Sequence, residues 1–430
     1  MQKNNPKTLT AWTFYDWANS VHSLTITSAI FPIYYPVAAI MLGSNTKTLD
    51  FLGFNIENTV LYSFTVSAAF LIIAFSVPLV SAISDYTGKK KAFMKMYCYL
   101  GALSTMVLYF FTEGRYYLGT FAFLFSIVGW GGSIVFYNSY IPEIATEEKY
   151  DSLSARGFTM GYIGSVILLI QNLTMVLKPE WYGGISSGLA SRISFLLVGI
   201  WWIAFAQIPF TILPETQQPR KQNGGWLLNG FKELKQVFEE LKHLAITKKF
   251  LGAFFFYNMG AQTVMYLGAL FGSQELKLPT DALIITILLI QLVAIIGAYF
   301  FSMLSNKIGN TKSLSISVVI WILVCVGAYF VQTQIQFYGL AIGIGFVMGG
   351  VQSLSRSTYA KLLPENTPDT AAYFSFYDVC DRLSTVLGTL MFGIVNQITG
   401  SMRFSVLILT VIFAIGLYLL SKIPSQKIYN

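Results

Sequence analysis

Charged residues are scarce in this sequence, and histidine is scarcer still. Asp, Glu, Lys and Arg together make up 11% of the 430 residues, whereas about 25% is usual in soluble domains. With two histidines in the whole chain, a metal centre or a catalytic cluster of acids and bases has little support. We therefore expect no soluble enzyme, no membrane enzyme, no metal and no cofactor.

Cysteine is also rare. Cys98, Cys325 and Cys380 all fall in apolar stretches, without paired spacing or neighbouring histidines. They are typical of small buried hydrophobic residues, which excludes a disulfide scaffold and a redox site. The sequence contains no Gly-x4-Gly-Lys-Ser/Thr loop, so we do not expect ATP to drive its activity. Its first twenty residues lack a short apolar core with a cleavage site, so no removable signal peptide is expected.

Apolar residues, in contrast, are abundant. They make up 54% of the chain, and phenylalanine alone occurs 35 times. A membrane span needs about 20 mostly apolar residues, and the apolar windows predict an all-α integral membrane protein with twelve spans. The predicted spans are 10–42, 59–84, 92–112, 117–141, 155–177, 192–213, 250–273, 282–304, 313–332, 336–359, 373–396 and 402–422.

The distribution of basic residues predicts the orientation. An even number of spans places both termini on one side of the membrane. Twenty of the 28 lysines and arginines, including Arg220, Lys221 and Lys427, then fall on that side, and six fall on the other. Because positive loops stay inside, this side is predicted to be cytoplasmic. The net charge of +8 is thereby explained by topology, and we expect no nucleic-acid partner.

One long polar connection, 214–249, divides the spans into an N-terminal half (1–213) and a C-terminal half (250–430). Within it, apolar residues recur at alternating spacings of four and three, at Leu227, Phe231, Leu234, Phe238 and Leu241. This pattern predicts an amphipathic helix lying on the inner membrane face. A partner-binding helix is the alternative.

The two halves repeat short motifs in the same order. The pattern S-x-x-S-D/N-x-x-G-x-x-K occurs at 81–91 and 302–312, Y-x4-P-E at 137–143 and 359–365, and F-Y-D/N at 14–16 and 256–258. Duplicated six-span halves with a binding site between them are typical of transporters. A receptor or channel does not need such a duplication.

The loop SAISDYTGKKKAF at 81–93 resembles the signature between spans 2 and 3 of the major facilitator superfamily, with Ser81 where that family has glycine. The resemblance implies the major facilitator fold, with two pseudo-symmetric six-helix halves. It also implies that Asp85 ties the halves together in one conformation and releases them in the other. The corresponding conformational motif comprises Asp85, Gly88, Lys89, Asn306 and Gly309.

Three further segments carry a narrower resemblance: YDWANS at 15–20, GGVQSLSRS at 349–357 and FYDV at 376–379. Together they resemble the vacuole-effluxer branch of the superfamily, the autophagy-related vacuolar amino-acid exporters and their bacterial relatives. The resemblance implies a transporter, an amino-acid substrate and, from the bacterial relatives, an inner-membrane location. The sequence departs from the branch at Asp381-Arg382, where Gly-Lys is expected, and this adds a carboxylate.

Polar residues within the first and seventh predicted spans are candidates for binding substrate or protons, because charges in a membrane are costly. Asp16, Asn19 and Ser20 share one helical face in the first span, and Asn258 and Gln262 share one in the seventh. The alternatives are a capped helix start for the first group and helix-to-helix hydrogen bonding for the second.

The tenth and eleventh spans contain a second set of candidates. Gln352 and Arg356 lie on one face of the tenth, and Asp378, Asp381 and Arg382 on one face of the eleventh. These charges either form an inner gate or bind a charged substrate group and a proton. For Arg356 and Asp378 we favour the gate, and we expect Asp378 or Asp16 to be the partner of Arg356, because Arg suits a carboxylate.

The sequence as a whole predicts a secondary active transporter that moves a small polar solute, an amino acid or short peptide, by alternating access. We expect coupling to protons, with Asp16 as the main proton-sensitive group, and a monomer in the lipid bilayer. A sugar or muropeptide permease of the same fold is the alternative within this class, and a non-transporting membrane receptor is the alternative outside it.

Overall fold

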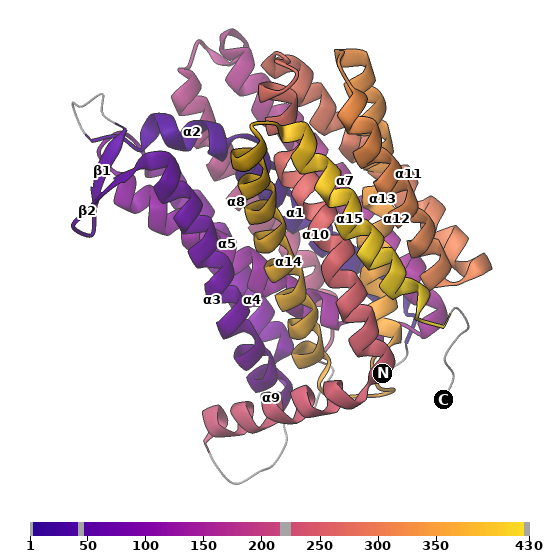
Figure 1. The fold of residues 1–430 in the computed structure, drawn as a ribbon. Coiled ribbons are helices and arrows are strands. Elements are labelled where there is room, and N and C mark those ends of the chain that lie inside the picture. The colour runs from indigo at the N-terminus through magenta and orange to yellow at the C-terminus, as the bar shows by residue number, and fades with distance from the viewer. Residues whose placement is uncertain (1–2, 42–46, 216–224, 425–430) are drawn as a thin grey trace.

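A computed structural model describes residues 3–41, 47–215 and 225–424, which form a bundle of long helices (Figure 1). Arg220, Lys221 and Lys427, which contribute to the predicted charge asymmetry, lie outside these residues, as does the side chain of Leu227. The elements before α9 are α1 (Pro6–Val21), η1 (His22–Ala29), α2 (Phe31–Ala38), β1 (Thr48–Phe51), β2 (Phe54–Glu57), α3 (Asn58–Thr87), α4 (Lys90–Val107), η2 (Leu108–Phe110), α5 (Tyr116–Ser139), α6 (Ile141–Ile144), α7 (Glu147–Leu177), η3 (Pro179–Tyr182) and α8 (Ser187–Ile212). The remaining elements are α9 (Trp226–His243), α10 (Ala245–Gln274), α11 (Thr280–Ile308), α12 (Asn310–Phe330), α13 (Gln334–Lys361), α14 (Thr370–Thr399) and α15 (Met402–Ser421).

Every predicted span coincides with a long helix or a run of helical segments. Within the described residues, 8 helices are long and apolar enough to cross a membrane on length and composition alone. The other helices that coincide with predicted spans, α1, α4, α10 and α14, do not meet this criterion, and α1 has 16 residues. Site candidates lie on three of these helices, α1, α10 and α14, and also on α13, which does meet it.

The first predicted span is not one continuous helix. After α1 the chain forms the π-helical segment η1, closed by bonds such as Ile30 N–H to Thr25 O at 2.8 Å. Side-chain hydroxyls compete there with backbone N–H groups for the carbonyl oxygens, since the Ser28 hydroxyl donates to Ser23 O at 3.0 Å. Pro32 and Pro36 follow in α2 and supply no N–H to an α-helical ladder. Hydropathy does not reveal this change of helix type, which frequently marks functional sites.

A short antiparallel hairpin occupies part of the connection expected to be a plain outer loop. Strands β1 and β2 pair Thr48 with Glu57 and Phe51 with Phe54. The turn residues Leu52 and Gly53 both have positive φ, 55° and 83°, which fits a two-residue type I′ turn.

The helix α9 crosses one end of the bundle, where both termini also lie (Figure 1). We call this the α9 end. The halves meet where α7 packs against α11 and α13 and where α3 and α5 pack against α14. The α9 helix packs along α3 and also contacts α14, so it touches both halves.

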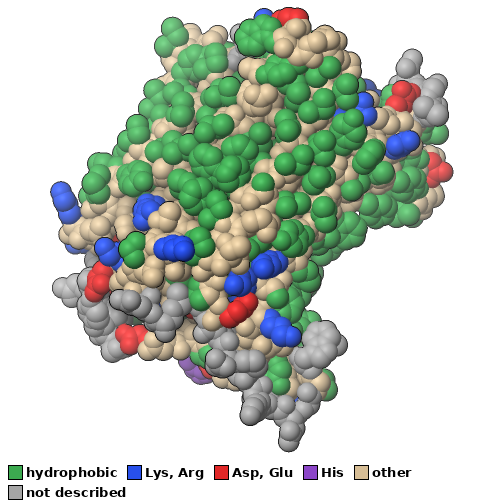
Figure 2. Space-filling model, turned by 180° about the vertical axis from the view of Figure 1, so that it is seen from behind, with side chains coloured by type: hydrophobic (Ala, Val, Ile, Leu, Met, Phe, Trp, Pro, Cys, Tyr) green, Lys and Arg blue, Asp and Glu red, His purple; other side chains and the backbone are tan. Residues whose placement is uncertain are grey.

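The α9 helix buries one face and exposes another. Val237 and Leu241 are buried, whereas Phe231 and Phe238 are 56% and 45% exposed. Elsewhere, large apolar side chains such as Phe75 on α3, 81% exposed, point away from the bundle. Figure 2 shows hydrophobic side chains covering the middle of one face, with charged ones toward its ends. Such a surface suits lipid rather than water.

Candidate functional site

Arg356 of α13 lies at the centre of a buried cluster that joins the two halves near the α9 end. Its Nη1 lies 3.2 Å from Asp16 Oδ2 of α1. It also donates to Asn138 Oδ1 of α5 at 3.2 Å and to the Ser154 hydroxyl and carbonyl of α7 at 2.9 and 2.8 Å. The two charged side chains are 3% and 9% exposed. One guanidinium therefore links three helices of the other half.

Aromatic rings enclose this Arg356 cluster. The guanidinium lies 4.1 Å from the ring centre of Phe158 and 5.0 Å from that of Trp12, distances at which cation–π attraction is effective. The Tyr137 hydroxyl donates to Asp16 Oδ2 at 2.7 Å. Asp16 thus has one cation and one neutral donor, which balances its charge. Of the two carboxylates considered for Arg356, the structure places Asp16 beside it.

Gly157 of α7 makes the close approach possible. A methyl group at this position would lie 2.5 Å from Asp16 Oδ2 and 2.9 Å from Arg356 Nη2. Gly161, one turn further, has the Ser20 hydroxyl 2.4 Å from the same virtual position. Ser20 therefore faces α7 of its own half, and Asn19 beside it is buried. The expected polar stripe of the first span is packed against a neighbouring helix.

A second buried cluster surrounds Arg382 of α14. The guanidinium donates to Asp378 Oδ1 at 3.0 Å and lies 3.6 Å from Asp381 Oδ2. Asp381 Oδ1 accepts hydrogen bonds from Asn258 at 2.8 Å and from Gln262 at 3.0 Å, both on α10. Four of the predicted site residues thus surround the same guanidinium or its partner carboxylate.

The Arg382 cluster contacts the other half through aromatic faces. The guanidinium lies 4.8 Å from the Trp130 ring of α5 and 5.5 Å from the Phe70 ring of α3. His22, in the π-helical segment, stacks against Trp130 with ring centres 6.0 Å apart and contacts the Ser126 hydroxyl at 3.1 Å. The histidine is a packed residue behind the tryptophan.

Gln352 provides a further link between the halves. Its Oε1 accepts from the Tyr162 hydroxyl of α7 at 2.6 Å, and its amide lies 3.8 Å from Met265 Sδ of α10. The residue lies one turn from Arg356 on α13. It therefore lies between the Arg356 cluster and α10, the helix that carries Asn258 and Gln262.

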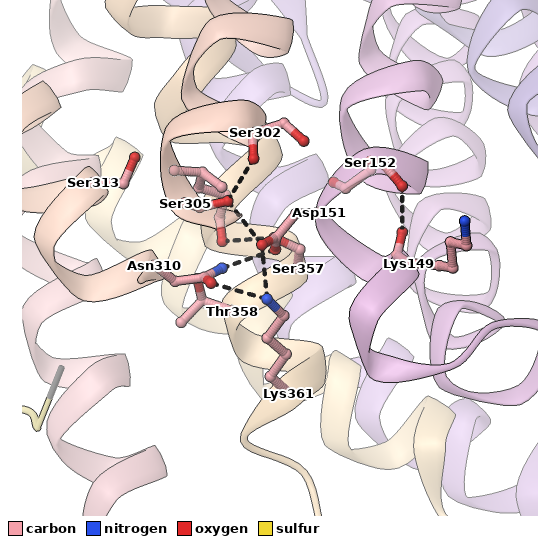
Figure 3. A network of polar contacts seen from close by, with 12 residues as sticks. Lys149, Asp151, Ser152, Ser302, Ser305, Asn310, Ser313, Ser357, Thr358 and Lys361 are labelled. Atoms are coloured by element: carbon pink, nitrogen blue, oxygen red, sulfur yellow. Dashed lines mark hydrogen bonds and ion pairs between the residues drawn. The ribbon is translucent and has the colours of Figure 1, made fainter. Parts of the chain in front are cut away.

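A third cluster, around Asp151 of α7, was not anticipated (Figure 3). Its carboxylate accepts from Lys361 of α13 at 2.7 Å, Ser305 of α11 at 2.8 Å and Asn310 of α12 at 2.8 Å. Asn306, the residue expected to matter in this loop, is exposed. Gly309, with φ of 86°, forms the turn that brings Asn310 into the cluster.

The matching cluster in the first half involves Asp85. Its carboxylate accepts from the backbone N–H groups of Ala371 and Ala372, at 3.4 and 2.8 Å, at the start of α14. A carboxylate is stabilised at a helix N-terminus. Gly88, with φ of 69°, ends α3 and allows the reversal.

The lysine that joins the halves at this loop differs from the expected one. Lys89 is exposed, whereas Lys90 is 1% exposed and pairs with Glu143. Lys90 also donates to the Thr370 hydroxyl at 2.5 Å. In a run of three lysines, the sequence alone does not show which one points inward. The helical phase set by Gly88 decides it.

The fold and these clusters can now be compared with known proteins. A model of the family described as vacuole effluxer Atg22 like matches residues 4–428. The chain belongs to this vacuole effluxer family. The MFS-type transporter YxiO of Bacillus subtilis is 30% identical to this chain over 99% of the chain and 97% of its own length. Autophagy-related protein 22 of Yarrowia lipolytica is 26% identical over 87% and 77%.

A solved structure agrees with the fold. The human organic anion transporter MFSD10 superposes with a TM-score of 0.73 at 13% identity, covering 97% of this chain and 100% of MFSD10. The resemblance to the vacuole-effluxer branch and the all-α major facilitator fold are confirmed. The chain is thus a multi-pass integral membrane transporter, of a fold and family that are not those of enzymes.

Proposed function

We propose that this transporter moves amino acids or short peptides across the membrane by alternating access, coupled to protons. The Arg382 cluster carries the proposal. Asp381 lies eleven residues into α14, or ~16 Å from the α9 end of a helix ~45 Å long at ~1.5 Å per residue. It therefore lies about a third of the way along α14 from the α9 end, deeper than Asp378 and on a helix that packs against the other half, and sites between the halves bind substrate in such transporters.

The chemistry of the cluster suits a solute with both charges. Arg382 offers a guanidinium for a carboxylate, and Asp381, 18% exposed, offers a carboxylate for an ammonium group. Asn258 and Gln262 add neutral hydrogen-bond donors and acceptors. A sugar carries no charge to offset the desolvation of an arginine and two carboxylates. The paired charges therefore favour amino acids or short peptides over sugars.

The contacts at the α9 end support the gating half of the proposal. The clusters around Arg356, Asp151 and Asp85 all join the halves there, so opening this end requires all three to separate. Since the positive-inside pattern assigns the α9 end to the cytoplasm, the clusters form the inner gate. We place the protein in a bacterial inner membrane, as a monomer.

Counterflow in liposomes tests the function. Purified protein is reconstituted into vesicles loaded with one unlabelled amino acid, and uptake of the labelled amino acid is followed without any ion gradient. Saturable, transient accumulation is expected for at least one amino acid or dipeptide and for no hexose. Accumulation of a hexose alone, or signal equal to that of empty vesicles across amino acids, dipeptides and muropeptides, would contradict the proposal.

A further inference from the structure

The Arg382 cluster carries one more negative charge than positive charge. Asp378 and Asp381 both face a single guanidinium, at 3.0 and 3.6 Å. The Arg356 cluster, in contrast, pairs one guanidinium with one carboxylate. A surplus charge inside a membrane-spanning segment is costly unless something cationic neutralises it. The question is what that cation is.

The neighbours of Asp381 do not supply it. From α10 the facing groups are the amides of Asn258 and Gln262 and the hydroxyl of Tyr266. From α3 and α5, the rings of Phe70 and Trp130 face the Arg382 guanidinium beside it.

The remaining titratable neighbours lie on α14 itself. They are Asp378, Arg382, the Tyr377 hydroxyl and the Cys380 thiol. Apart from Arg382, none of these described groups is positively charged near neutral pH. The missing charge therefore comes from outside the protein.

Asp381 is the member of the cluster that solvent or solute can reach. Its side chain is 18% exposed, against 8% for Asp378 and 6% for Arg382. It also points away from lipid, because Leu383 and Leu387 form an exposed face of α14, and residues two apart on a helix point in nearly opposite directions. Its access is thus to the space where the halves meet.

We propose that Asp381 takes up either a proton or a solute with one net positive charge, and that the two exchange. With a proton on Asp381, the cluster is neutral. When a basic amino acid binds, its extra cationic group pairs with the Asp381 carboxylate, the proton leaves to solvent, and the cluster is neutral again. A zwitterion with no net charge would leave the surplus uncompensated. The substrate class is therefore basic amino acids and short cationic peptides, exchanged against protons.

This inference rests on the proposed function and predicts the sign of its pH dependence. If proton and solute compete for one carboxylate, affinity rises with pH, by at most about tenfold per pH unit. If they bind together, as in a symporter, affinity rises as pH falls. The arrangement on α14, which packs against α3 and α5 of the other half, lets each conformational exchange alter the water access of the site.

Binding of arginine to the purified full-length chain tests the inference. Calorimetry between pH 6 and 8, in two buffers of different ionisation enthalpy, gives both the Kd and the number of protons released. We expect tighter binding at higher pH, release of up to one proton, and arginine or lysine preferred over leucine by at least tenfold. Asp381→Asn, whose amide oxygen can still accept from Asn258, should lose both the preference and the pH dependence.

Two further variants keep the result interpretable. Asp381→Glu retains the charge and should retain the pH dependence, and Glu239→Gln neutralises an exposed carboxylate in α9 and should behave as the unmodified chain. Binding that tightens as pH falls, or leucine bound as tightly as arginine, would overturn the inference even if Asp381→Asn fails to fold. Leucine counterflow without arginine preference would leave the transport function standing and remove only the exchange.

Discussion

Two arginines, Arg356 and Arg382, hold similar buried positions but contact the opposite half in different ways. Arg356 reaches across to Asp16, Asn138 and Ser154 with directional hydrogen bonds. Arg382 donates its hydrogen bonds to Asp378 of its own helix and lies over the rings of Trp130 and Phe70 of the other half.

The difference indicates that the two arginines have different roles in transport. Directional bonds to a charged partner are strong in a dry interior and are lost all at once when the helices separate. Contact with an aromatic face is weaker and tolerates sliding. Arg356 is thus suited to hold one conformation of the gate, and Arg382 to stay with its carboxylates while the halves move around the site.

The largest expected effect comes from removing Arg356. Arg356→Ala strands the buried Asp16 carboxylate, and loss of one member of a buried pair costs ~3–5 kcal/mol. We expect a large drop in the thermal midpoint in detergent and no counterflow. The double variant with Asp16→Ala should recover most of the midpoint without recovering transport.

A second double variant sharpens the comparison between the arginines. Combining Arg356→Ala with Asp378→Ala should recover nothing, because Asp378 is paired with Arg382. If Asp16→Ala and Asp378→Ala recovered the thermal midpoint of Arg356→Ala equally, the net charge of the two clusters together, and not the pairing of individual residues, would determine stability.

Gly157→Ala tests how closely α7 must approach Asp16 and Arg356, by adding a single methyl group. The new carbon would lie 2.5 Å from Asp16 Oδ2, and forced overpacking costs ~1–3 kcal/mol. Transport should slow and the midpoint should fall by less than in Arg356→Ala. Gly252→Ala in α10 is the matched control, since nothing lies within 4 Å of its added carbon. Similar losses in both variants would point to general helix damage.

Positions of the spans could be predicted from sequence, whereas the partner of Arg356 could not. Span positions depend on local hydropathy, which each window contains. Asp16 and Asp378 both lie in the cytoplasmic third of their spans, and only the packing of α1 against α7 brings one of them to α13. The Gly157-x3-Gly161 spacing is the sequence feature that indicates such close packing.

Asp151 was missed for a different reason. It follows Glu147, Glu148 and Lys149 in a stretch typical of a solvated loop. In the structure α7 begins at Glu147, so Asp151 is already one turn into the helix and buried. Its partners come from three helices of the other half, and no local pattern contains that information.

Substitutions in the Asp151 and Asp85 clusters should have intermediate effects on transport, and the two effects should differ in size. Asp151→Ala removes three side-chain bonds, including the one from Lys361. Asp85→Asn can keep one of its two bonds through its amide oxygen, because Ala371 and Ala372 donate to different carboxylate oxygens. We expect Asp151→Ala to slow counterflow strongly and Asp85→Asn to slow it less, with the substrate Kd within a few fold in both. A large loss of equilibrium binding in either variant would place that residue at the substrate site instead.

The smallest effect is expected at Glu239 and Lys242 of α9, whose ion pair has a shorter N–O distance, 2.9 Å, than the 3.2 Å of Arg356 and Asp16. Both side chains are about half exposed, so water screens the pair and competes for its bonds. The hydrogen bond from Lys242 lowers the pKa of Glu239 below its usual value of 4.5. A lowered pKa in the folded state stabilises the fold above the unfolded pKa, and this contribution disappears as the pH falls through the lowered value. Glu239→Gln should therefore leave the thermal midpoint unchanged at pH 7 and alter its pH dependence only below about pH 4.5. If Glu239→Gln lowered the midpoint at pH 7 as much as Gly157→Ala, the contribution of an ion pair to the stability of this protein would depend on its N–O distance rather than on its burial.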